Sequence, residues 1–195
     1  KASNNVFNLL ISHEVAHALF TPDEDWRKKA NIPQGFINVT EDVRIEMLMK
    51  KKYSGLPKTF FRGYQELHDQ DFFGIEDEDV STMNIADRVN LHFKIGNFLK
   101  VPFTAAEMVV VEQCAAAVTF DDAIAAAEAL YALHEQQKED QHRFGGAPET
   151  YGAEQQNGDA AEHDEQRQQG QQVVRGRWID PERAGNKRSV AQQGQ

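Results

Sequence analysis

The sequence contains one motif whose residue types and spacing suit metal chemistry, the His-Glu-x-x-His run of His13, Glu14 and His17. In a helix, residues four positions apart project from the same face, so the two imidazoles would point toward one spot. Two neutral imidazole nitrogens at this spacing can bind one Zn²⁺ ion. Glu14 would lie about 100° further round the helix. There it can take a proton from a zinc-bound water that attacks an amide carbonyl.

The alternative is a helix with two surface histidines and a solvated glutamate, because so short a motif also arises by chance. The neighbouring residues favour the metal site. The motif lies in an amphipathic helix, and small Ala16 and Ala18 stand beside it, where a second helix could approach closely. We therefore expect His13 and His17 to be metal ligands and Glu14 to be the general base.

A catalytic zinc ion needs a third protein ligand and leaves its fourth position to water. The metzincin spacing is disfavoured, because position 23 holds Asp where that motif has its third histidine. Asp42 is the favoured third ligand, since it follows His17 after enough residues for a loop and a returning helix. Glu41 is the rival ligand.

Glu46 lies four positions after Asp42, on the same helical face. It could accept the N–H of a ligating histidine and so fix its tautomer. Ile45, four positions after Glu41, could not do so, which favours Asp42 over Glu41. The competing interpretation is an ordinary charged helix start, where the helix dipole favours acids.

Hydrophobic periodicity predicts helices through nearly all of residues 1–139. Thr21 and Pro22 end the first helix, and Thr104 with Glu107 forms a capping box that opens the fourth. We expect a mainly α fold, a bundle of about five helices with the zinc site between the first two. No helix is assigned in 56–75, where a short edge strand stays possible. The expected helices span 6–20, 37–52, 82–99, 104–118 and 121–138.

The composition changes near Asp140, where the sequence becomes rich in Gln and Gly. Such a segment cannot bury enough apolar surface to offset the entropy lost on ordering. We therefore expect one folded domain, 1–139, followed by a disordered tail or linker, 140–195. Within that tail, residues 173–181 are the part best suited to dock on another surface, through Trp178.

The 195 residues include 31 Asp and Glu against 21 Lys and Arg, a net charge of -10. This acidity argues against nucleic-acid and anionic-membrane partners, and no apolar run is long enough to span a bilayer. The single cysteine, Cys114, excludes an intrachain disulfide and fits a reducing, cytoplasmic compartment; we expect it to be buried. The chain begins Lys-Ala-Ser, without an initiator Met or a signal segment, which indicates a processed or truncated piece of a longer protein.

Other polar residues rank lower. The acidic run 76–79 lacks the loop spacing of a calcium site, so a solvated loop is expected. Tyr64, His68 and His92 could each donate a hydrogen bond to an oxyanion. A structural role in the core or at the surface is expected for all three.

The residues 13–22 (HEVAHALFTP), followed by 38–46 (NVTEDVRIE), resemble the metallopeptidase-like region of CobT-type proteins. These are von Willebrand A-containing relatives of a cobaltochelatase subunit, and tailed phages encode similar proteins beside a CobS-like AAA+ ATPase. The stretches 71–74 (DFFG), 87–94 (DRVNLHFK) and 101–104 (VPFT) fit the same pattern. The resemblance covers residues 1–139.

The resemblance implies a gluzincin-like site, with His13 and His17 as ligands, Glu14 as base and an acid from 41–42 as third ligand. It also implies a CobS-like ATPase as partner and, for a phage protein, the host cytoplasm as compartment. The chain departs from the family because it has no Asp-x-Ser-x-Ser signature of a von Willebrand A domain.

Two functions follow from these observations. The first is a zinc-dependent metallopeptidase that acts on a peptide or protein substrate, with Glu14 as general base. The alternative is a non-catalytic CobT-like adaptor of an AAA+ ATPase complex, in which zinc is structural. The intact Glu14 favours the enzyme, because a structural site needs no base.

Overall fold

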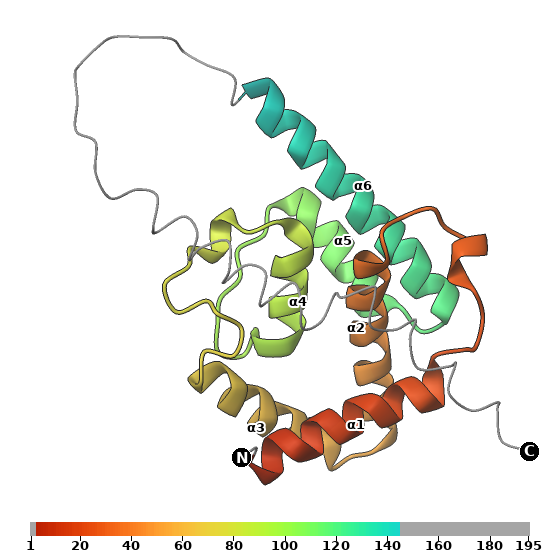
Figure 1. The fold of residues 1–195 in the computed structure, drawn as a ribbon, viewed down its shortest axis with the longest axis vertical. Coiled ribbons are helices and arrows are strands. Elements are labelled where there is room, and N and C mark those ends of the chain that lie inside the picture. The colour runs from red at the N-terminus through yellow and green to blue at the C-terminus, as the bar shows by residue number, and fades with distance from the viewer. Residues whose placement is uncertain (1–2, 145–195) are drawn as a thin grey trace, which may run out of the picture.

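The computed structural model describes residues 3–144, which form six α-helices and two short 3-10 helices (Figure 1). The described residues contain no strand, so the expected mainly α fold is confirmed, with six α-helices in place of about five. The predicted tail begins within the last helix, and residues 145–195, including 173–181, lie outside the described part. The elements are α1 (Asn4–Phe20), η1 (Trp26–Lys28), α2 (Gln34–Lys52), α3 (Leu56–Asp69), η2 (Val80–Thr82), α4 (Ile85–Ile95), α5 (Ala105–Ala116) and α6 (Phe120–Phe144).

Helix α1 lies along one edge of the molecule, with α3 beside it and α2 crossing it steeply (Figure 1). The Ser3 hydroxyl caps its first turn by accepting from the Val6 N–H, and Thr21 ends it as expected. Ala16 is fully buried and packs with Ile45 of α2, so a small residue does allow the two helices to approach. Ala18 is exposed and takes no part in this contact.

Helix α3 corrects the expectation of a loop or an edge strand in 56–75. Pro57, which could also end the preceding helix, lies in the first turn of α3. A proline is tolerated there, because the first-turn N–H groups have no partner within the helix. The buried face of α3 carries Phe60, Gly63, Tyr64 and Leu67, at helical spacing.

The three later helices agree with expectation in number and differ in their bounds. Asn84 caps α4 by accepting from the Asp87 N–H, so α4 begins after position 82 and is shorter than expected. The capping box of Thr104 and Glu107 is present at the start of α5. Helix α6 runs to Phe144 and projects past its neighbours (Figure 1).

The buried side chains form two main clusters. One lies between α1, α3 and α4 and includes Leu9, Phe60 and Ile95. The other lies between α2, α4, α5 and α6 and includes Val89 and Leu130. Helix α4 contributes to both clusters, and the polar residues Asp42 and Glu46 of α2 meet α1. Among the described residues, no helix is long and apolar enough to cross a membrane.

Candidate metal centre

Three ligand-type atoms from two helices converge at the crossing of α1 and α2. His13 and His17 lie one turn apart on α1, with ring centroids separated by 4.9 Å. Asp42 of α2 faces both rings: its Oδ1 lies 3.5 Å from Nε2 of His13 and 3.3 Å from Nε2 of His17. One ligand atom of each residue lies within 4.8 Å of the other two. The structure thus brings together the three residues that the sequence favoured as ligands.

The tautomer of His13 follows from its second ring nitrogen. Nδ1 of His13 lies 3.1 Å from Oε1 of Glu46, a buried carboxylate. Tyr64 donates its hydroxyl to the same oxygen. A carboxylate oxygen can only accept, so Nδ1 of His13 carries the proton. Nε2 of His13 is then an acceptor, and its lone pair is available on the side of Asp42.

The tautomer of His17 is set by a longer chain of hydrogen bonds. Arg44 donates to both oxygens of Glu41, and the Thr21 hydroxyl donates to Oε1 of Glu41 at 2.6 Å. Because the hydroxyl proton of Thr21 is committed to Glu41, its oxygen accepts from Nδ1 of His17, 3.0 Å away. In the neutral imidazole, Nε2 of His17 is therefore also an acceptor, directed at Asp42.

When both imidazoles are neutral, three acceptor atoms face one another, and either a proton on His17 or a metal ion between them relieves their repulsion. The donor set of two imidazole nitrogens and one carboxylate oxygen is one that zinc favours. Ligands about 2.0–2.1 Å from a tetrahedral ion lie roughly 3.3–3.4 Å from one another. The separations from Asp42 to the two histidines are 3.5 and 3.3 Å. Both separations are close to that spacing, and the third, between the two histidines, is at most 4.8 Å, so the residues fit a zinc ion.

A buried lysine forms ion pairs with the two carboxylates of the site, Asp42 and Glu46. Nζ of Lys94, on α4, lies 3.1 Å from Oδ2 of Asp42 and 3.6 Å from Oε1 of Glu46. Burial alone would raise the pKa of both carboxyls, but Lys94 and the neighbouring histidines, with Lys50 beside Glu46, together outweigh it and hold the pKa of each below its ordinary value. The same carboxylates raise the pKa of Lys94 well above its ordinary value, despite its burial. Asp42 therefore offers one oxygen to the histidines and the other to Lys94.

One side of the site is accessible to solvent. The His13 side chain is 6% exposed and that of His17 is 34% exposed, so access is from the His17 side. Burial opposes the protonation of His17, but the nearby carboxylates, Asp42 first and then Glu41 and Glu14, raise its pKa above the ordinary value. Glu14 is itself exposed, close enough for its charge to act on His17.

The sequence-predicted residues therefore separate into two groups. Asp42 faces the histidines and Glu46 supports His13, whereas the rival, Glu41, is directed at Arg44 and Thr21. Sequence reasoning missed Lys94 and the role of Thr21, whereas a pairing of Arg44 with one of the acids of α2 is compatible with the sequence and is found with Glu41. The sequence does contain a signal for Lys94, because a lysine among the buried positions of α4 requires an acidic partner.

The lower-ranked residues take structural roles. Tyr64 is buried beneath the site and bonded to Glu46, and His92 packs edge-on against Phe103. His68 stacks on Phe98, and its buried Nδ1 has no hydrogen-bond partner among residues 3–144. Residues 76–79 form an exposed loop, and Cys114 is buried, as expected. Burial raises the pKa of the Cys114 thiol to about 12.

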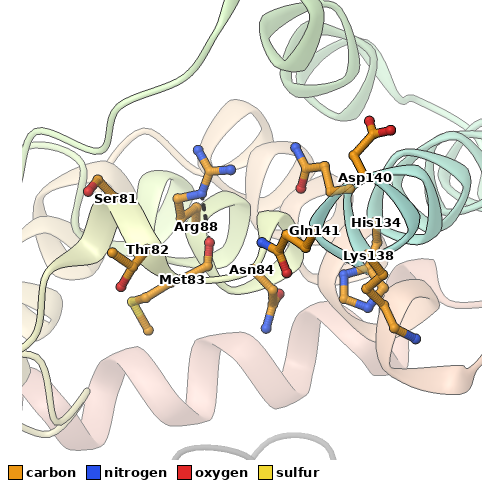
Figure 2. Close-up of a pocket in the computed structure, with 10 residues that line it drawn as sticks. Ser81, Thr82, Met83, Asn84, Arg88, His134, Lys138, Asp140 and Gln141 are labelled. Carbon is orange, nitrogen blue, oxygen red and sulfur yellow. Dashed lines mark hydrogen bonds between the residues drawn. The ribbon is translucent and has the colours of Figure 1, made fainter. Parts of the chain in front are cut away.

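A separate polar pocket of about 530 Å³ lies between the start of α4 and the end of α6 (Figure 2). Arg88 forms part of its wall and donates from Nε to the carbonyl of Met83 at 3.0 Å (Figure 2). The rest of this guanidinium is bonded to the Pro102 carbonyl and to Glu107. Arg88 therefore has a structural role, and the pocket includes none of the sequence-predicted site residues.

Comparisons with family models, with curated proteins and with solved structures found no match to this chain.

Proposed function

We propose that this protein is a zinc-dependent metallopeptidase that hydrolyses a peptide or protein substrate. One observation carries the proposal: when neutral, His13 and His17 are held in the tautomers that direct both Nε2 atoms, as acceptors, at one Asp42 oxygen. The described residues supply three such ligands, and the His17 side is accessible. Three protein ligands with an open position are typical of catalytic zinc, whereas structural sites are closed by four.

Different residues of the site would bind the ion, transfer the proton and orient the imidazoles. His13, His17 and Asp42 would hold the ion, and Zn²⁺ supplies a Lewis acid that polarises a carbonyl and acidifies a water molecule. Glu14 accepts the proton of the attacking water and delivers it to the leaving amine, as an exposed carboxylate beside His17 can do. Glu46 and Thr21 keep the two imidazoles in the ligating tautomer.

A structural zinc in an adaptor of an AAA+ complex is the second candidate. It is favoured by the position of the site, which links four helices: α1 and α2 directly, α3 through Tyr64 and α4 through Lys94. An ion bound there would add to the stability of the whole described domain, because it binds only the folded arrangement.

The experiment compares wild-type protein with Glu14→Gln and Asp42→Asn. Elemental analysis should find about one zinc per chain in wild type and in Glu14→Gln, and a loss in Asp42→Asn. Hydrolysis of a quenched fluorescent peptide library should fall about 10³-fold or more in Glu14→Gln, because the general base is lost. Zinc in wild type with no hydrolysis would leave the adaptor as the function. No zinc in folded wild type would end both proposals.

A further inference from the structure

Helix α1 presents an apolar stripe to solvent, on the side away from the metal centre. Phe7, Ile11, Val15 and Leu19 follow one another at four-residue steps, and their exposed fractions are 57, 49, 41 and 49%. Val15 projects about 200° from His13, on the opposite face of the helix. A surface helix normally has polar residues on the face that points to solvent. Contiguous exposed apolar patches of this kind mark binding surfaces.

The stripe borders a groove of about 450 Å³, where α1 meets the α2–α3 connection. Ile11 and Val15 form one wall, and Tyr53 and Leu56 are among the residues on the other side. The groove is shallow and mainly apolar. A helix with bulky side chains on one face can insert them into such a groove, whereas a flat surface cannot.

The border of this groove is basic, although the protein as a whole is acidic. Residues 50–62, which pass from the last turn of α2 into α3, contain five basic residues and no acidic one. Of these, Lys51, Lys52, Lys58 and Arg62 are exposed. Charges separated by more than about 8 Å are largely screened at physiological salt. A ligand in the groove would therefore experience this local positive charge more than the net charge of -10.

We propose that the stripe and groove form a docking site for an acidic amphipathic helix of a partner protein. The partner's apolar face would cover Phe7, Ile11 and Val15, and its acidic flank would face Lys58 and its basic neighbours. This site is independent of the metal centre, since it uses the other face of α1.

Two other occupants are outcomes of the test. A second copy of the chain, joined by a two-fold axis, would present an identical surface, which has no acidic segment to match the basic border. An anionic bilayer would also be attracted by the basic border, so vesicle binding is measured as a competing outcome. A short acidic helix complements both the basic border and the apolar groove.

The test uses the full chain and a fluorescein-labelled synthetic helix with Leu on one face and Glu on the other. A second peptide, with Lys in place of Glu, is the comparator, and binding is measured by fluorescence anisotropy at low and high salt. The Glu peptide should bind about tenfold or more tightly than the Lys peptide, and salt should weaken it. No saturable binding, or equal binding of both peptides, would overturn the proposal.

Four variants locate the binding site. Ile11→Glu should weaken binding about tenfold. Its matched control is Val109→Glu, at an exposed position of α5, which should leave binding unchanged. Lys58→Glu should weaken binding severalfold, and Lys100→Glu is its matched control. Circular dichroism checks that each variant folds. Equal effects in a variant and its control would overturn the proposal. A wild-type dimer that Ile11→Glu abolishes would also overturn it, and so would binding to phosphatidylserine vesicles that is tighter than binding to the Glu peptide.

Discussion

Lys94 and a bound metal ion would neutralise the same two carboxylates. Nζ of Lys94 lies 3.1 Å from Asp42 and 3.6 Å from Glu46, and both carboxylates are largely buried. Without a metal, Lys94 supplies most of the positive charge that makes their burial tolerable, because Lys50 reaches only Glu46 and is partly exposed. The lysine thus allows the site to fold before any ion binds. The same cation must oppose an ion that arrives later.

We therefore predict that Lys94→Met lowers the stability of the metal-free protein and increases the stabilisation produced by zinc. The loss should be about 3–5 kcal/mol, the usual consequence of leaving a buried charge unpaired. Zinc should then shift the melting temperature more than in wild type, because the ion replaces the missing positive charge. Calorimetry with and without zinc measures both effects. Lys50→Met is the control, and an equal zinc shift in Lys94→Met and wild type would contradict the prediction.

At the scale of elements, the site depends on how closely α3 approaches α1. Gly63 of α3 lies against Leu9 of α1, where an added Cβ would meet the Leu9 Cβ at 2.7 Å and the Asn5 carbonyl oxygen at 3.1 Å. Neither atom is the far end of a flexible side chain, so neither can move aside at little cost. Helix α3 also carries Tyr64, which bonds to Glu46. The glycine therefore sets the distance from which Tyr64 reaches the site.

We predict that Gly63→Ala destabilises the protein by about 1–2 kcal/mol. Overpacking costs about 1–3 kcal/mol, and the better helix propensity of alanine returns up to about 1 kcal/mol. Gly55→Ala is the matched control, because an added Cβ there meets nothing within 4 Å. Urea unfolding gives both values. A Gly63→Ala protein as stable as the Gly55→Ala protein would show that α1 and α3 can separate freely.

At the scale of the whole molecule, one buried ion pair joins the last three helices. Glu107 of α5 accepts from Arg88 of α4 and, at 2.7 Å, from Gln137 of α6. Burial alone would raise the pKa of Glu107, but Arg88, the Thr104 N–H and Gln137 outweigh it and lower this pKa to about 2. These helices pack on α2 and so hold Asp42 and Lys94 in place.

We predict that the pair sets part of the acid stability. The folded pKa of Glu107 is about 2, below its ordinary value of 4.5. Its contribution to stability is therefore complete above the unfolded pKa and is lost as the pH falls through that interval. Glu107→Gln should cost about 3 kcal/mol at pH 7 and flatten the decline in acid. Thermal melts of wild type and Glu107→Gln between about pH 2 and pH 4.5 measure this loss of stability. A parallel decline in the two proteins would contradict the prediction.

The sequence by itself determined the local features of this protein. The His13–His17 spacing, the Asp42–Glu46 spacing and the capping box of Thr104 depend only on helix periodicity and neighbouring residues, and each is found as predicted. The mainly helical class follows from the same periodicity. Helix α3 was missed, because a proline is equally compatible with the end of one helix and the first turn of the next.

Only the tertiary structure decided which distant residues meet. Asp42 and Glu41 are adjacent in sequence and chemically similar, and it is the crossing angle of α1 and α2 that turns one toward the histidines and the other toward Arg44. Lys94 reaches Asp42 from a helix far along the chain. Burial and charge pairing between remote segments depend on packing, which local periodicity does not encode.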